Sequence, residues 1–105
     1  MNWPIGVKTS DKKKELTSLR DRLKVLDETL LATLRQREAI AKEIAKIKLD
    51  LQLAIEQPDV WKATVKTRGT QAESLGLRAA FVEDLFSKIH EESVRIQQQE
   101  IARIK

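Results

Sequence analysis

Residues 16–54 read LTSLRDRLKVLDETLLATLRQREAIAKEIAKIKLDLQLA, a stretch without glycine or proline. Its apolar residues recur in steps of three and four, which is typical of one face of a long amphipathic helix. This apolar seam consists of Leu16, Leu19, Leu23, Leu26, Leu30, Ile40, Ile44, Ile47, Leu51 and Ala54. The spacing predicts a helix from about residue 11, with Ser10 or Asp11 as its N-cap, to about residue 53.

Arg37 occupies a position within the apolar seam. A guanidinium stays charged and is unfavourable to bury unless an anion meets it. Lys48 follows eleven residues later, so both cations project from nearly the same side of the helix, roughly 16 Å apart along its axis. The pair is a candidate anion-binding site. The alternative is structural, because Arg37 can extend along its stem to the edge of the seam or pair with a glutamate of a neighbouring helix.

Two shorter helices are predicted after the first. Gln57-Pro58-Asp59 interrupts the helical pattern, and Pro58 suits the first turn of a second helix over about residues 59–75. Gly76 is a typical C-terminal stop signal for that helix. A third helix is expected from about residue 79 to about residue 104. No β-rich stretch competes, so the predicted fold class is all-α, with three helices per chain and a long first helix.

The first helix is too long for the remainder of one chain to cover. A helix of about 40 residues spans about 60 Å, and a chain of 105 residues buries only a small core by itself. Two copies are therefore expected to share the helix in an intertwined homodimer. Residues 1–10 are expected to form an irregular leader, and residues 11–105 a single helical domain.

Composition excludes several functional classes. The chain has no cysteine and one histidine, so neither an ordinary zinc site nor Ser-His catalysis is expected, and no metal or cofactor is predicted. Without a signal-length apolar run or a membrane span of about 20 apolar residues, we expect a soluble, cytoplasmic protein. The 20 basic and 16 acidic residues are intermixed and leave a net charge of +4. This pattern favours a small anionic ligand over nucleic acid.

The third predicted helix carries polar groups on one face. Ser93 and Gln97 are four residues apart and therefore share that face. Taken alone they are typical of solvated surface. Combined with Arg37 and Lys48, they predict cations and neutral donors around one cavity. The single histidine, His90, is expected to have a structural or surface role.

Several short stretches, taken in order and spacing, carry a family resemblance. They are Leu19, Arg20 and Asp27; Arg37; Lys48; Gly76, Leu77, Phe81 and Phe86; and residues 89–93 followed by Gln97. Together they resemble the all-helical chorismate mutases, which are small dimers whose three helices per chain intertwine with a partner. The resemblance covers about residues 16–100 and implies chorismate as the substrate.

The resemblance implies a role for individual residues. Arg37 and Arg20 would bind substrate carboxylates, with Arg20 reaching in from the other subunit of the homodimer. Lys48 and Gln97 would donate hydrogen bonds to the ether oxygen of the substrate. Ser93 would line the pocket near the substrate hydroxyl or carboxylate.

The sequence departs from the family pattern after the proline-containing break. Counting nine residues from Lys48 puts Gln57 at an acidic substrate-binding position, and Val60 and Trp61 where many members have arginine and glutamate. Val60 leaves a cation missing unless Lys62 or Arg68 substitutes for it. A charge-assisted hydrogen bond contributes about 1.5–3 kcal/mol, so this loss would weaken transition-state binding.

The implied reaction is the Claisen rearrangement of chorismate to prephenate in the shikimate pathway to phenylalanine and tyrosine. It needs no nucleophile, proton transfer or metal, only groups that hold the reactive conformer and stabilise charge on the ether oxygen. A pyruvate lyase of the same fold acting on isochorismate is one alternative. A non-catalytic, regulatory helical dimer is another, which Val60 favours. Association with another enzyme of the pathway stays open.

Overall fold

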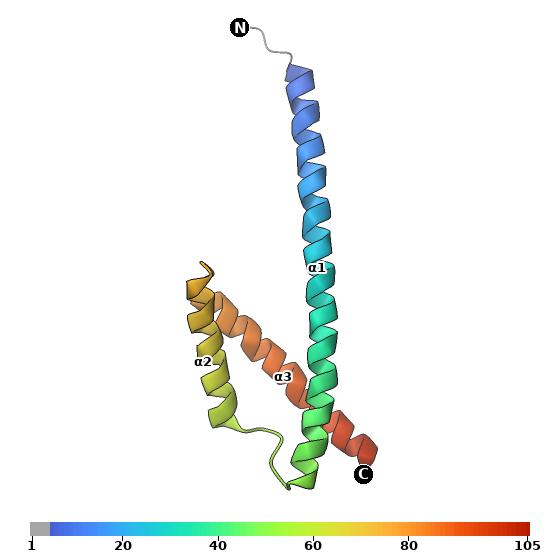
Figure 1. The fold of residues 1–105 in the computed structure, drawn as a ribbon, viewed down its shortest axis with the longest axis vertical. Coiled ribbons are helices and arrows are strands. Elements are labelled where there is room, and N and C mark those ends of the chain that lie inside the picture. Colours follow the sequence, from blue (N-terminus) through green and yellow to red (C-terminus); the bar gives the residue numbers. More distant parts are fainter. Residues whose placement is uncertain (1–4) are drawn as a thin grey trace. The chain divides into compact units, whose positions relative to one another are not determined.

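The computed structural model describes the backbone of residues 5–105 and the side chains from Thr9 onward. It contains three helices, α1 (Ile5–Asp50), α2 (Pro58–Ser74) and α3 (Ala79–Ile104), which are labelled in Figure 1. No strand occurs between residues 5 and 105. The predicted all-α class with three helices and a long first helix is therefore confirmed.

Helix α1 begins earlier than the sequence pattern predicts. Residues 5–10 are helical, so the expected irregular leader is wrong for this segment, and residues 1–4 lie outside the described residues. Extending an existing helix by one residue is far easier than starting one, so a helix does not have to begin at the first good N-cap. Ser10 and Asp11 consequently lie inside α1.

The chain divides into two compact units, residues 1–36 and residues 37–105, which are described separately. The first unit is the N-terminal part of α1, and every residue from 9 to 36 is exposed. The apolar seam is present here, but Leu23, Leu26 and Leu30 are 59, 61 and 60 % exposed. The seam therefore forms an uncovered apolar face on the described part of this unit.

The second unit contains the rest of α1 together with α2 and α3, and α2 packs against α3. Its buried apolar residues are Ala41, Ala45, Ala72, Val82, Val94 and Ile96. On α1 the small Ala41 and Ala45 are buried, at 5 and 0 % exposure, whereas Ile40 and Ile47 of the seam are 60 and 58 % exposed. The buried side of α1 therefore lies beside the predicted seam and not on it.

Helix α1 ends at Asp50, about one turn before the predicted end. The Leu53 amide donates to the Lys48 carbonyl at 2.8 Å, and the Gln52 amide donates to the Leu49 carbonyl at 3.1 Å. This pair of bonds is a Schellman motif, and Gln52 takes the left-handed conformation that the motif requires, with φ 57°. No glycine marks this turn in the sequence.

Helix α2 begins and ends within one residue of the predicted bounds. Pro58 lies in its first turn, and Gly76 follows its end with φ 74°. The Leu77 amide donates to the Ala72 carbonyl at 2.8 Å and the Gly76 amide to the Glu73 carbonyl at 3.0 Å, which is again a Schellman motif. Helix α3 begins at Ala79, two residues after Leu77.

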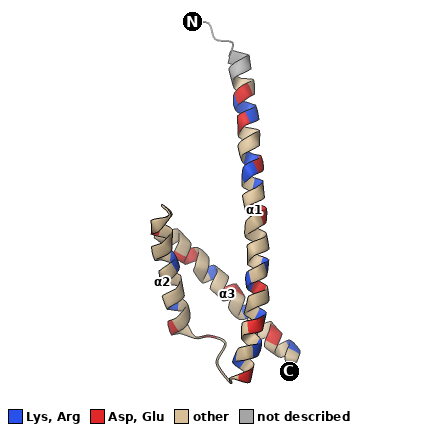
Figure 2. Cartoon of the chain, in the orientation of Figure 1, with Lys and Arg blue, Asp and Glu red and all other residues tan. Residues whose placement is uncertain are grey.

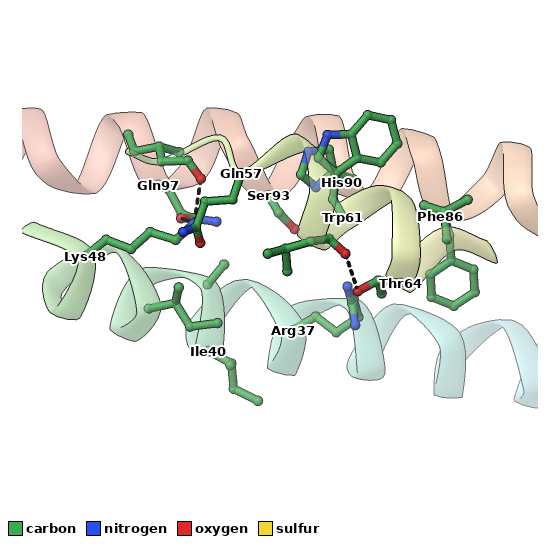
Figure 3. Close-up of a pocket in the computed structure, with 15 residues that line it drawn as sticks. Arg37, Ile40, Lys48, Gln57, Trp61, Thr64, Phe86, His90, Ser93 and Gln97 are labelled. Atoms are coloured by element: carbon green, nitrogen blue, oxygen red, sulfur yellow. Dashed lines mark hydrogen bonds between the residues drawn. The ribbon is translucent and has the colours of Figure 1, made fainter. Parts of the chain in front are cut away.

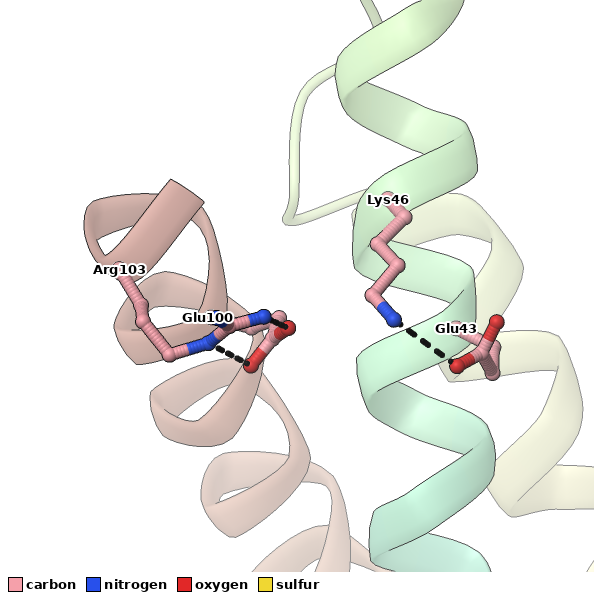
Figure 4. Close-up of polar contacts among 4 residues, drawn as sticks. All are labelled: Glu43, Lys46, Glu100 and Arg103. Carbon is pink, nitrogen blue, oxygen red and sulfur yellow. Dashed lines mark hydrogen bonds and ion pairs between the residues drawn. The ribbon is translucent and has the colours of Figure 1, made fainter. Parts of the chain in front are cut away.

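Charged residues of both signs are interspersed along the helices (Figure 2). Figure 4 shows two pairs in the second unit, Lys46 with Glu43 at 3.1 Å on α1 and Arg103 with Glu100 on α3. Hydrogen bonds from Arg103 are the main reason that the pKa of Glu100 is lowered, and the α1 lysines Lys42 and Lys46 add to the effect. These charges link α1 to α3 electrostatically.

Among the described residues, no helix combines the length and the apolar character that a membrane span requires.

Candidate active site

A cavity of about 320 Å³ lies within the second unit and is lined by all three helices and the α1–α2 loop. Its lining includes the predicted site residues Arg37, Lys48, Gln57, Ser93 and Gln97. Among them, Lys48 and Gln97 are 49 positions apart in the chain and are in contact (Figure 3). Arg20 belongs to the first unit and is not among the lining residues.

Lys48 and Gln97 are in direct contact at one end of the cavity. The Lys48 ammonium donates to the Gln97 side-chain oxygen Oε1 at 2.9 Å and to the Ile55 carbonyl at 2.6 Å (Figure 3). Gln97 is only 6 % exposed, so this contact holds its amide in place. With Oε1 turned toward Lys48, the amide Nε2 is left as a donor for another group.

No carboxylate of residues 9–105 forms an ion pair with Lys48. Both of its acceptors are neutral amide oxygens, and burial lowers the pKa of its ammonium below the ordinary value. An ammonium has three donor hydrogens, so the two bonds leave one for a ligand. A partly desolvated cation with a free donor is suited to stabilising negative charge on a bound molecule.

Arg37 lies toward the other end of the same cavity. Its guanidinium carbon is 5.9 Å from the centre of the Phe86 ring, within the range of a cation–π contact. None of the ion pairs formed by residues 9–105 involves Arg37. The structural alternative of a glutamate partner therefore has no support in the described chain. Its charge is available to an anion.

The cavity lining also includes Ser93, Gln57 and Val60. Ser93 is half-buried on α3, one turn from Gln97, as its spacing predicts. Gln57 is the residue that precedes α2 and is also half-buried. Val60 lines the cavity and is 60 % exposed, so it presents an apolar surface to the cavity.

The structure places His90 in the cavity lining, where the sequence predicts only a structural or surface role. Its ring stacks on Trp61 with the centres 4.6 Å apart and the planes at 17°. Burial is the main reason that its pKa is lowered, Lys48 acts in the same direction, and Glu56 and Glu91 oppose the shift. Nε2 of His90 is buried without a hydrogen-bond partner in the described chain.

Sequence reasoning also missed Thr64 and Phe86 as lining residues. A signal for His90 existed, because it precedes Ser93 by three residues and therefore lies on the same helical face. Thr64 gave no comparable signal, because an isolated threonine on a helix is typical of the surface. Phe86 was part of the family resemblance, but the resemblance gave it no role in the site.

The arrangement is suited to an organic anion. Arg37 and Lys48 supply positive charge from one helix, Gln97 and Ser93 supply neutral donors, and apolar side chains such as Ile44 form the walls. No group of three or more His, Cys, Asp or Glu residues that could hold a metal ion occurs in the described part of the chain. The site can bind, orient and stabilise charge with these residues alone.

The sequence matches a known protein family over the residues that line the cavity. The model of the family described as chorismate mutase type II matches residues 19–98, which include every predicted site residue. The chain is 32 % identical over 79 residues to the T-protein of Enterobacter agglomerans. The match covers 75 % of this chain and 21 % of the T-protein, so the chain spans about a fifth of the length of that curated relative.

Proposed function

Because the chain belongs to the chorismate mutase type II family, we propose that it converts chorismate to prephenate in the cavity of its second unit. The observation that carries the proposal is the contact between Lys48 and Gln97. It sets an uncompensated ammonium and a free amide donor side by side at the cavity wall. The product would serve phenylalanine and tyrosine synthesis.

The reaction explains why these residues suffice. Chorismate is a dianion, and in its rearrangement one carbon–oxygen bond breaks while one carbon–carbon bond forms. No proton moves, so catalysis requires a held conformer and stabilisation of the negative charge that develops on the ether oxygen. Arg37 supplies a cation for a carboxylate. Lys48 and Gln97 supply donors for the ether oxygen, and both are held in place before the substrate arrives.

Ser93 and Gln57 are proposed to contact the polar groups of the substrate. Both are half-buried in the cavity lining, and neither carries a charge at neutral pH. A hydroxyl and an amide can each donate and accept, so they suit the substrate hydroxyl or a carboxylate oxygen. Their contribution is orientation of the substrate, which is one of the two requirements of this reaction.

We further propose that two copies of the chain form a homodimer through the N-terminal part of α1. Leu19 and Leu23 are 47 and 59 % exposed, and full burial of a leucine contributes about 1.5–3 kcal/mol. Arg20 lies between these leucines in the sequence, so burying them against a second copy brings Arg20 to that copy. In this arrangement Arg20 completes the cation set of the partner's cavity.

Product analysis tests the proposed activity. The purified chain is given chorismate, and the loss of chorismate and the formation of prephenate are followed by absorbance. A second reaction offers isochorismate, with salicylate and pyruvate as the products sought. Lys48→Ala, purified in the same way, controls for contaminating enzyme.

The expected result is prephenate from chorismate, at a rate at least about a hundredfold lower for Lys48→Ala than for the wild type. Salicylate and pyruvate from isochorismate, with no prephenate from chorismate, would instead identify a lyase. A folded chain inactive on both substrates would contradict the proposed activity and identify a non-catalytic dimer.

A further inference from the structure

Two arginines share one aromatic ring beside the cavity. The guanidinium carbons of Arg37 on α1 and Arg68 on α2 each lie 5.9 Å from the centre of the Phe86 ring. Phe86 and Arg37 line the cavity, and Figure 3 shows Phe86 at the end away from Lys48. The Phe86 ring therefore gathers two positive charges at the end of the cavity opposite the ammonium.

Arg68 lies on the side of α2 that forms the cavity wall. Thr64 and Val65 line the cavity, and Arg68 follows them by four and three residues, so it lies one turn further along the same side. Its side chain is half-buried. Its long, flexible stem allows the guanidinium to change position.

The charge of Arg68 is free to meet an anion. The guanidinium donates one hydrogen bond, to the side-chain oxygen of Gln71 at 3.1 Å on the exposed surface. No carboxylate pairs with Arg68 or with Arg37 among the ion pairs of residues 9–105. Two like charges near one ring repel each other, and an anion between them removes the repulsion.

We propose that Arg68 is a further substrate-binding residue, which together with Arg37 holds one carboxylate of the dianionic substrate at the Phe86 end of the cavity. The inference rests on the proposed function, which supplies a substrate with two carboxylates. Guanidinium groups are suited to this contact because their planar fork matches a carboxylate. Lys48 and Gln97 remain for the ether oxygen at the opposite end.

Val60 provides a way to test this assignment by rescue. It lines the cavity and lies four residues before Thr64, so Val60, Thr64 and Arg68 follow one side of α2. Its 60 % exposure leaves room for a longer side chain. A guanidinium introduced at Val60 therefore reaches the cavity from the same wall as Arg68.

The first experiment removes the Arg68 charge. Arg68→Gln should raise KM for chorismate about tenfold and leave kcat within about twofold, because a carboxylate is bound equally in the substrate and in the transition state. Lys66→Gln is the matched control, since it removes one exposed charge from the same helix two residues away. It should leave KM unchanged, and both variants should keep the wild-type melting temperature.

The second experiment adds Val60→Arg to each background. In the Arg68→Gln chain it should restore KM to within about threefold of the wild type, whereas in the wild type it should lower KM by less than about threefold. Such non-additivity is expected of two groups that serve the same ligand carboxylate. The same gain in both backgrounds would overturn the assignment, as would equal KM increases in Arg68→Gln and Lys66→Gln.

Binding of prephenate, measured by calorimetry with the same variants, separates this inference from the proposed activity. Prephenate is also a dicarboxylate, and its binding requires no turnover. Weaker binding to Arg68→Gln and recovery with Val60→Arg would support the inference even for a wild type without mutase activity. Equal binding by wild type and Arg68→Gln, or no binding by either, would overturn it.

Discussion

The Lys48 ammonium donates a hydrogen bond to Gln97 Oε1 at 2.9 Å, joining residues 49 positions apart on α1 and α3. The contact determines which end of the Gln97 amide faces the cation and which end remains a donor. It also explains why Lys48 keeps an uncompensated charge, since its partner is neutral. The proposed catalytic pair is therefore positioned by its own hydrogen bond.

Lys48→Ala should lower kcat by about a hundredfold to a thousandfold and change KM little, because the ether oxygen gains charge only in the transition state. Steady-state kinetics with chorismate measures both constants. Lys46→Ala is the matched control, since Lys46 lies on the same helix and pairs with Glu43 on the exposed surface. A rise in KM with kcat intact in Lys48→Ala would refute the assigned role.

Gln97→Glu should make activity depend on pH. A carboxylate in place of the amide only accepts hydrogen bonds, and Lys48 beside it favours the ionised form. The donor to the ether oxygen is present only when the carboxyl is protonated, so activity should survive at acidic pH and fall as pH rises. A profile of kcat/KM that stays flat with pH would exclude Gln97 as the donor.

His90→Phe should reduce the loss of folding stability in acid. The lowered pKa of His90 means that the unfolded chain binds its proton more readily, so stability is lost as pH falls below the ordinary value of 6.5. Phenylalanine retains an aromatic ring against Trp61 but has no proton site. Denaturant unfolding at about pH 7 and about pH 5 measures the difference.

The groups around His90 shift its pKa in opposite directions. The change in stability between the two pH values is therefore compared between wild type and His90→Phe. Lys48 acts with burial to lower the pKa of His90, whereas Glu56 and Glu91 raise it. These residues are present in both proteins, so the difference between wild type and His90→Phe reports on His90. Equal losses of stability in wild type and His90→Phe would show that His90 titrates alike in the folded and unfolded states.

Much of the fold was predictable because its signals are local. Pro58 and Gly76 suit the first turn and the end of α2, and the structure confirms both. The end of α1 was not predictable in the same way, because Gln52 adopts the left-handed conformation that glycine usually signals. The start at Ile5 was missed because helix extension does not need a strong N-cap.

The candidate site was predictable only where charge and spacing coincide. Arg37 within the seam and Lys48 eleven residues later indicated a shared side of one helix, and both line the cavity. The Trp61–His90 stack and the place of Phe86 depend on how α2 and α3 pack. Such tertiary contacts leave no periodic signal in a single sequence.

Replacing two exposed leucines of the first unit by lysine should prevent dimer formation. Leu23→Lys with Leu26→Lys replaces side chains that are 59 and 61 % exposed in one chain and that the proposed dimer buries. Burying two ammonium groups without partners is strongly unfavourable. Sedimentation at micromolar concentration should show a dimer for wild type and a monomer for the variant. A compact wild-type monomer would contradict the shared-site arrangement.

Heterodimers of an Arg20→Ala chain and an Arg37→Ala chain test whether the cavity of one chain is completed by Arg20 of the other. Each homodimer should be nearly inactive, because every site lacks one cation. In the heterodimer one site carries both defects and the other carries neither. Each verified heterodimer should therefore form prephenate at about half of the wild-type rate. Heterodimers that recover no activity would contradict the shared-site arrangement.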